Sequence, residues 1–120
     1  MKIIVCGSRS MNDAVFVKEC LDKSKFRPVM TEIITGGAGG VDTLAYWWAR
    51  FNNIPCRVFR ARWSDGPAAG PLRNHRMVKE ADGLIAIWEG TSHGTSNAIR
   101  NAEEAGIPIE VHTFKQTTII

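Results

Sequence analysis

The sequence predicts an α/β fold of the Rossmann-like type, a three-layer sandwich whose parallel sheet of about five strands has helices on both faces. Short apolar runs alternate with segments whose apolar residues recur at helical spacing, and the connections between them are short. The chain of 120 residues, 44% of them hydrophobic and 22% charged, has the composition of one globular domain with its own core. We therefore expect a single domain over residues 1–120, with a frayed tail at 115–120.

Three of the expected strands lie in the first half of the chain. Residues 3–6 are a continuous apolar run, which is typical of a buried strand, and the residue at position 12 or 13 caps the helix that follows. A second strand is expected at 32–35. Apolar residues spaced at i, i+3, i+4 and i+7 then predict a helix that packs on the sheet and ends at Asn52-Asn53, before a third strand at 55–59.

The second half of the chain continues the alternation of helix and strand. Residues 61–70 are expected to form a loop, and Pro71 takes the first position of the next helix, where its missing N–H does no harm. A second continuous apolar run, 84–88, predicts another buried strand. Gly106 ends the last helix, and a fifth strand with alternating apolar residues opens at Pro108.

The apolar patterns of the strands also predict their order in the sheet. Continuous apolar runs belong to central strands and alternating ones to edges, which gives the order 3-2-1-4-5. In open parallel sheets, ligands bind outside the carboxyl ends of the strands, where the strand order reverses. We therefore expect the loops after strands one, two and four, at 7–10, 36–42 and 89–95, to converge on one binding site.

The loop after the second strand is the strongest candidate for a phosphate site. It contains Gly36, Gly37, Ala38, Gly39 and Gly40. Glycines allow close approach to the main chain, so their N–H groups can hold a phosphate together with the positive end of the next helix. The other interpretation is a tight turn in which the glycines serve only the path of the chain.

The loops after strands one and four offer compatible groups. Gly7, Ser8 and Arg9 follow the first strand, where a hydroxyl and a guanidinium could bind phosphate oxygens. Ser92, Gly94 and Thr95 lie at the start of the last helix and offer N–H groups, hydroxyls and the helix dipole. Taken alone, the first set is also compatible with a surface arginine on a turn, and the second with an ordinary helix cap.

Four further residues are candidates for contact with a ligand. Arg73 and Asn74 fall in the first turn of the helix expected from Pro71; a cation there opposes the helix dipole, so a nearby anion explains its position better than helix formation does. The negative charge of Asp42 stabilises the start of its own helix, so its position there has a structural explanation. Asp42 could therefore be structural, contact a ribose or act as a general base. Trp63 could stack on a base.

Composition and missing motifs argue against other classes of protein. The net charge is +3, from 15 Lys and Arg and 12 Asp and Glu without a basic run, so nucleic acid is not an expected partner. No apolar stretch approaches a membrane span and Met1 leads directly into a strand, so a cytoplasmic location is expected. The histidines and the three cysteines lack metal-ligand spacing, and GxxxxGKS/T, HExxH and GxSxG do not occur, so we expect buried thiols and neither metal nor cofactor.

Four segments in order resemble the SLOG superfamily, and in particular its small single-domain branch related to the YspA and YpsA proteins, often of phage or bacterial origin. The segments are VCGSR at 5–9, TGGAGGVD at 35–42, ARW at 61–63 with AGPLRNHRM at 69–77, and GT at 94–95. The resemblance covers nearly the whole chain. It implies a Rossmann-like nucleotide-binding domain, with the LOG phosphoribohydrolases and the DNA-processing protein DprA as relatives.

One departure from the LOG enzymes bears on catalysis. Those enzymes use an arginine in an RKxxM segment and a glutamate in PGGxGTxxE. The resemblance matches Arg73 and Met77 to the first motif and Gly94-Thr95 to the second, but Ala98 replaces the glutamate. Without that carboxylate, no group stabilises the transition state and no base activates water, unless Asp42 or Glu89 takes over these roles.

We therefore expect a receptor for a nucleotide or nucleotide-derived signalling molecule, ADP-ribose-like, NAD-like or cyclic, that senses or sequesters it. The alternative is a nucleotide N-glycosidase related to the LOG enzymes, with Asp42 and Arg73 as catalytic candidates. DprA-like binding of nucleic acid fits less well, because the chain has no basic stripe. The expected partners are a small nucleotide and a second copy of the chain, in a homodimer or higher homo-oligomer.

Overall fold

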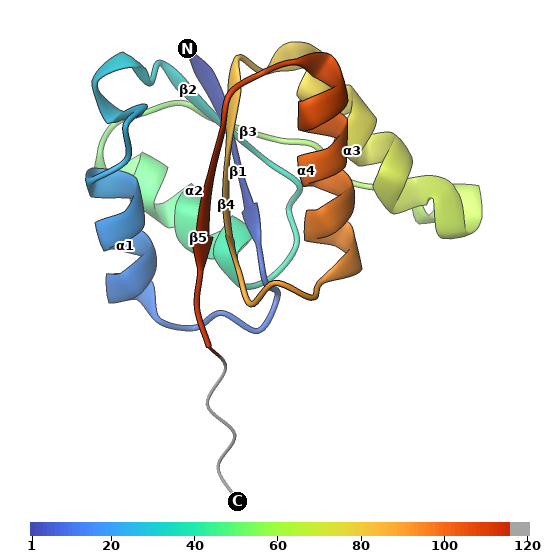
Figure 1. The fold of residues 1–120 in the computed structure, drawn as a ribbon, viewed down its shortest axis with the longest axis horizontal. Helices are drawn as coiled ribbons and strands as arrows, with labels where there is room; N and C mark the ends of the chain where they lie inside the picture. The colour runs from blue at the N-terminus through green and yellow to red at the C-terminus, as the bar shows by residue number, and fades with distance from the viewer. Residues whose placement is uncertain (116–120) are drawn as a thin grey trace, which may run out of the picture.

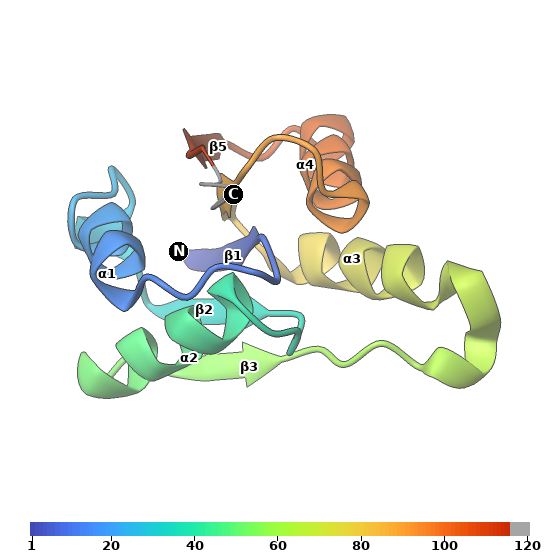
Figure 2. The same cartoon turned by 90° about the horizontal axis from the view of Figure 1, so that it is seen from below.

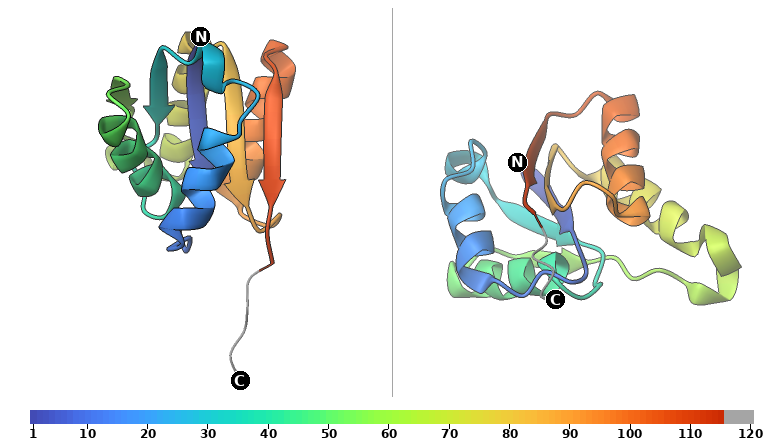
Figure 3. Two further views of the ribbon diagram at one scale, coloured as in Figure 1. Left: turned by 90° about the vertical axis from the view of Figure 1, so that its left-hand side faces the viewer. Right: turned by 60° about the horizontal axis from the view of Figure 1, so that its bottom comes forward.

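A computed structural model describes residues 1–115, so the expected frayed tail lies outside the described residues apart from Lys115. All five strands are parallel and follow the order β3-β2-β1-β4-β5, which confirms the predicted fold class and strand order. The left view of Figure 3 shows the arrows of β2, β1, β4 and β5 side by side and pointing the same way. The strands are β1 (Lys2–Gly7), β2 (Glu32–Thr35), β3 (Cys56–Val58), β4 (Gly83–Trp88) and β5 (Ile109–Thr113).

Two helices cover each face of the sheet, as predicted (Figures 1 and 2). They are α1 (Ala14–Asp22), α2 (Val41–Phe51), α3 (Ala69–Glu80) and α4 (His93–Ala105). Alternate residues of the central strands enter two separate cores: Ile3 and Ile33 pack with α1 and α2, and Ile4 and Ile34 with α3 and α4. No helix within residues 1–115 has the length and apolarity needed to cross a membrane.

Local signals fix several helix ends where the sequence predicts them. Asp13 caps α1, and its Oδ1 accepts the N–H of Phe16 at 3.0 Å. Asn52 caps the end of α2. Gly106 ends α4 in the left-handed conformation, with φ of 73°, which favours glycine.

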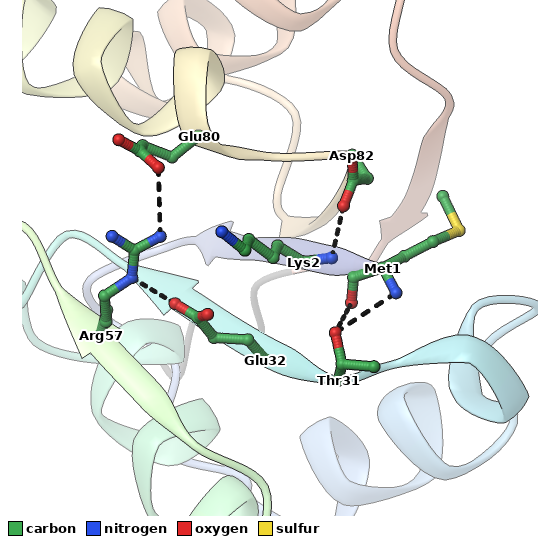
Figure 4. Close-up of polar contacts among 7 residues, drawn as sticks. All are labelled: Met1, Lys2, Thr31, Glu32, Arg57, Glu80 and Asp82. Carbon is green, nitrogen blue, oxygen red and sulfur yellow. Dashed lines mark hydrogen bonds and ion pairs between the residues drawn. The ribbon is translucent and has the colours of Figure 1, made fainter.

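A polar network joins the amino ends of the strands, opposite the loops predicted to bind a ligand (Figure 4). Arg57 pairs with Glu32 and, at 3.4 Å, with Glu80. The backbone N–H of Lys2 donates to Asp82 at 2.8 Å. Because the Arg57 and Glu80 side chains are 43% and 47% exposed, the ion pair between them contributes little to stability.

The segment before α3 differs from the prediction. Trp63–Ala68 forms a short 3₁₀ segment, η2, interrupted at Gly66, and α3 begins at Ala69, so Pro71 is its third residue. The first N–H groups of a helix have no partner within it, so proline is tolerated throughout this turn. Arg73 and Asn74 consequently lie in the second turn, and the argument that they oppose the dipole in the first turn was wrong. Figure 2 shows η2 extending away from the sheet.

Candidate functional site

A cleft of two adjoining cavities opens at the carboxyl ends of β1, β2 and β4. We call them the inner cavity, of about 230 Å³, and the outer cavity, of about 420 Å³. Both are lined by Arg9, Gly36, Ala38 and Arg73, so they form two lobes of one cleft. The position agrees with the rule that ligands of open α/β sheets bind where the strand order reverses.

The cleft brings together most of the residues proposed from the sequence. Those that line the inner cavity are Gly7, Arg9, Gly36, Ala38, Asp42, Arg73, Asn74, Met77, Ser92, Gly94 and Thr95. Gly37, Gly39 and Trp63 line the outer cavity together with the four shared residues. Ser8 and Gly40 line neither cavity.

Ser8 and Gly40 instead join the loops that form the cleft. The Ser8 carbonyl accepts the N–H of Val41 at 3.1 Å, and its buried hydroxyl accepts the N–H of Glu89 at 3.2 Å. Gly40 has φ of 68°, and a Cβ there would lie 2.1 Å from the Ser8 carbonyl oxygen. The loops after β1, β2 and β4 are therefore held together by these two residues.

Asp42 holds the glycine loop through hydrogen bonds to its backbone. Its side chain is only 7% exposed, and its Oδ2 accepts the N–H groups of Gly36 and Ala38, both at 3.1 Å. These two N–H groups are thus engaged within the protein, whereas those of Gly37 and Gly39 donate no hydrogen bond within residues 1–115. The second oxygen of Asp42, Oδ1, has no hydrogen bond within the same residues, and Asp42 lines the inner cavity. It therefore offers a free acceptor to a ligand.

Burial raises the pKa of Asp42 from 3.8 to about 6, against the opposing effect of its two backbone hydrogen bonds and of Arg73 and Arg9. The folded protein therefore binds this proton more tightly than the unfolded chain does. The resulting stabilisation is complete below pH 3.8 and is lost as the pH rises through about 6.

Replacing Asp42 by Asn is expected to stabilise the protein at neutral pH by about 2–3 kcal/mol, because the amide stays uncharged while its carbonyl can accept the same N–H groups. Urea unfolding at pH 7 and at pH 4 measures this, and the gain should shrink at pH 4. The exposed Asp65, changed to Asn, is the matched control and should alter neither value. A destabilised D42N protein at pH 7 would show that the charge itself holds the loop.

Arg73 is a buried cation with one unused side of its guanidinium. Its side chain is 8% exposed; Nη1 donates to the carbonyl of Gly36 at 2.5 Å, and Nε donates to Asn74 Oδ1 at 2.9 Å. Nη2 makes no hydrogen bond within residues 1–115. Burial lowers the pKa of Arg73, and the positive charges of Arg9 and Arg76 act in the same direction. An anion in the cleft would relieve both effects.

Asn74 ties this guanidinium to the start of α4. While its Oδ1 accepts from Arg73, its Nδ2 donates to the carbonyl of Gly94 at 3.2 Å and to Asn97 Oδ1 at 3.0 Å. Every polar atom of the Asn74 side chain is thus bonded within the protein. Asn74 orients Arg73 relative to α4 and is not a free group for a ribose.

The N-terminus of α4 is open. The helix has 13 residues, and Ser92 precedes it without making a side-chain cap. The N–H groups of Gly94 and Thr95, in its first turn, make no hydrogen bond within residues 1–115, and both residues line the inner cavity with Arg73, while the Glu89 carboxylate lies beside the N–H of Ser92. An uncapped helix N-terminus next to a buried arginine is an anion-binding arrangement.

Glu89 does not supply the carboxylate that Ala98 lacks. It accepts the N–H and the hydroxyl of Thr91, at 3.3 and 3.2 Å, and lines neither cavity. Asp42 is consequently the one carboxylate, among residues 1–115, that lines the cleft. Within the same range no cluster of His, Cys, Asp and Glu side chains could hold a metal ion.

Four lining residues were missed by the prediction of the site. Cys6 and Ala98 line the inner cavity, where burial raises the pKa of the Cys6 thiol far above its usual value and keeps it protonated. Arg60 and Ala61 line the outer cavity. Arg60 and Ala61 follow β3, which is an edge strand away from the point where the strand order reverses, so the rule applied to the other strand ends did not point to them.

The outer cavity adds an aromatic surface and a further cation. Trp63 is 66% exposed and lines this cavity with Arg60. An exposed indole next to guanidinium groups suits a planar ring that carries a phosphate. The outer face of α2 is separate: Trp47 and Phe51, which are 59% and 83% exposed, line a groove of about 290 Å³ between α1 and α2.

Comparison with known proteins gives one family, one relative in sequence and two solved structures with the same fold. Residues 1–66 match the family described as YspA, cpYpsA-related SLOG family. The chain is 37% identical over 117 residues to the Gene 61 protein of Mycobacterium phage D29, covering 90% of this chain and 93% of the phage protein.

Two solved structures share the fold. DNA processing protein A (DprA) from Streptococcus pneumoniae superposes with a TM-score of 0.73 at 18% identity, over 92% of this chain. This chain spans about half of DprA, 49% of its length. TM1055 superposes with a TM-score of 0.66 at 19% identity, over 90% of this chain and 71% of TM1055.

Proposed function

The chain belongs to the YspA, cpYpsA-related SLOG family, and from this premise we propose that its cleft binds a nucleotide or a nucleotide-derived signalling molecule. Family membership and the fold shared with DprA support a nucleotide-related role in general. The observation that carries the finer proposal is the unused Nη2 of the buried Arg73 beside the uncapped start of α4.

Each part of a nucleotide has a matching group in the cleft. A phosphate would accept hydrogen bonds from Arg73 Nη2 and from the N–H groups at the start of α4. A ribose hydroxyl would donate to Asp42 Oδ1. A base would stack on Trp63 in the outer cavity. ADP-ribose-like, NAD-like and cyclic nucleotides all provide these parts.

We propose that the protein acts by holding this ligand intact in the cytoplasm, as a sensor or as a sequestering protein. The similarity to a protein of Mycobacterium phage D29 supports the second form, in which a phage protein removes a signalling nucleotide of the host. The homodimer expected from the sequence stays a prediction, and the exposed aromatic residues of α2 are the surface on which to test it.

Mass spectrometry of retained compounds tests the proposal. The protein is incubated with a pool of mononucleotides, cyclic nucleotides, NAD and ADP-ribose, separated from free compounds, and extracted. We expect one compound to be retained intact, and to be lost from an Arg73→Met variant that remains folded. If the wild-type protein retains none of them, the proposal is wrong.

A second candidate function, hydrolysis of an N-glycosidic bond, is favoured by one observation. Asp42 lines the inner cavity, and its pKa of about 6 is suitable for a general acid or base near neutral pH. In the same experiment a hydrolase would release free base or ribose phosphate, and Asp42→Asn would abolish the release while keeping binding. Retention of the intact compound by both proteins, without any product, would eliminate this candidate.

A further inference from the structure

The strand β5 forms an open edge of the sheet. It is the last strand in the order β3-β2-β1-β4-β5, and the left view of Figure 3 shows it as the outermost strand on its side. The opposite edge strand, β3, has three residues, whereas β5 has five. An edge strand exposes a row of unpaired N–H and C=O groups, and a short edge limits pairing with other chains. The longer edge at β5 is therefore the better surface for pairing between chains.

Alternate residues of β5 direct their backbone groups away from β4. The carbonyl of Pro108 accepts the N–H of Leu84 at 3.0 Å, and the N–H of Phe114 donates to the carbonyl of Trp88 at 3.1 Å. Alternate residues of a paired strand bond to the same neighbour, so the even-numbered positions of this segment face β4. The residues whose N–H and C=O groups face the open side, here called the outward residues, are Ile109, Val111 and Thr113.

The outward residues can pair with the same edge of a second copy. A twofold axis perpendicular to the sheet sets the two β5 strands antiparallel, with Val111 opposite the partner's Val111 and Ile109 opposite the partner's Thr113. All three outward residues then fall in hydrogen-bonded pairs, and each pair exchanges two hydrogen bonds. The side chain of Val111, which is 47% exposed, would be covered by its counterpart.

The residues between the outward ones favour the same register. With Val111 on the twofold axis, each Glu110 lies opposite the partner's His112, where a carboxylate and an imidazole attract one another. Sliding one strand by two residues would set Glu110 opposite the partner's Glu110, or His112 opposite the partner's His112. It would also leave one outward residue of each β5 unpaired. Backbone and side chains therefore select the register centred on Val111.

Contacts within one copy already hold these side chains in place. Glu110 Oε1 accepts the Ser24 hydroxyl at 3.2 Å and the N–H of Lys25 at 3.0 Å, and its Oε2 lies 2.8 Å from His112 Nε2. His112 Nδ1 has no hydrogen bond within residues 1–115. The Glu110 and His112 side chains are 14% and 31% exposed, so little side-chain freedom is lost when a second copy binds.

We propose that β5 pairs with β5 of a second copy across a twofold axis at Val111, which joins the two five-stranded sheets into one. The contact uses the same edge of both copies, so assembly ends at a dimer. Because the strands run antiparallel across it, the two clefts lie at opposite ends of the joined sheet. Each copy therefore binds its ligand alone, and the dimer stands or falls independently of the proposed function.

Sedimentation equilibrium of the full chain tests the proposal. At about 300 μM we expect the wild-type protein to have twice the 13.3 kDa mass of one chain. Val111→Pro removes an outward N–H but no bond to β4, because proline is tolerated where the N–H faces outward. We expect it to weaken dimerisation at least about a hundredfold while circular dichroism shows a folded chain. Val111→Ala keeps the N–H and, as the matched control, should weaken it by about tenfold or less.

A second pair of variants tests the register. His112→Glu sets two carboxylates opposite each other and should give monomers, whereas His112→Lys keeps a cation opposite the partner's Glu110 and should give dimers. Trp47→Ser changes the exposed face of α2 and should leave the dimer unaltered.

Three results would overturn the proposal: a monomeric wild-type protein, a dimeric Val111→Pro protein, or a dimer that Trp47→Ser dissociates. Amide hydrogen exchange of Ile109 and Thr113 identifies a further one. Their N–H groups should be protected in the dimer and exchange rapidly in the Val111→Pro monomer. Protection that persists in that monomer would mean that another part of the same chain covers the edge, and the proposal would be wrong.

Discussion

Gly40→Ala is expected to remove most of the stability of the fold, whereas Gly39→Ala, one residue earlier, should leave it nearly unchanged. At Gly40 the backbone has φ of 68°, and a Cβ would lie 2.1 Å from the carbonyl oxygen of Ser8. The oxygen belongs to the backbone, so the clash can be relieved only by separating the loops that form the cleft. With the strain of the left-handed conformation included, we expect a loss of about 4 kcal/mol or more.

Urea unfolding followed by circular dichroism measures both variants. A Cβ at Gly39 would have the carbonyl oxygen of Arg9 as its nearest neighbour, at 3.8 Å, which is an ordinary contact. Gly39→Ala should therefore stay within about 1 kcal/mol of the wild type. Equal unfolding midpoints for the two variants would show that the loop accommodates a Cβ at position 40. Gly40 would then not be needed for the contact between the end of β1 and the start of α2.

Arg73→Met is expected to weaken binding of a phosphate-containing ligand by about a hundredfold. The substitution keeps an unbranched side chain but removes the free Nη2 donor and the charge. It also removes the hydrogen bonds to Gly36 and Asn74 that position the start of α4. One charge-assisted hydrogen bond contributes about 1.5–3 kcal/mol, which corresponds to this loss of affinity.

The matched control for Arg73 is Arg76, one turn further along α3. Arg76 donates to the carbonyl of Arg60 at 3.0 Å and lines neither cavity. Calorimetry with ADP-ribose should show that Arg76→Met binds within about threefold of the wild type. If both variants lose affinity equally, the ligand responds to the overall positive potential and not to the placed guanidinium of Arg73.

The fold was predictable because the sequence features that indicate it, helix caps and apolar patterns, depend on neighbouring residues or on burial. Strands that are buried on both faces must be continuously apolar, and this separated the runs at 3–6 and 84–88 from the alternating edge strands. The start of α3 was predicted wrongly because proline is tolerated anywhere in the first helical turn, so Pro71 alone does not mark the first residue.

The members of the candidate site were more predictable than their roles. Strand order placed the correct loops together, and most of the proposed residues line the cleft. Sequence patterns could not show that Asp42 takes up two N–H groups of the glycine loop, or that the amide of Asn74 is fully bonded. The contacts of Asn74 join segments that are distant in the chain, and those of Asp42 require the glycine loop to fold back onto its own helix.

The most direct test of the proposed cleft is NMR mapping of backbone amides during titration with ADP-ribose and, separately, with AMP. We expect the largest shifts on Gly37, Gly39, Gly94 and Thr95, which line the two cavities and whose N–H groups have no partner in the described part of the chain. Shifts concentrated on α2 around Trp47, or no shifts with either compound, would contradict it.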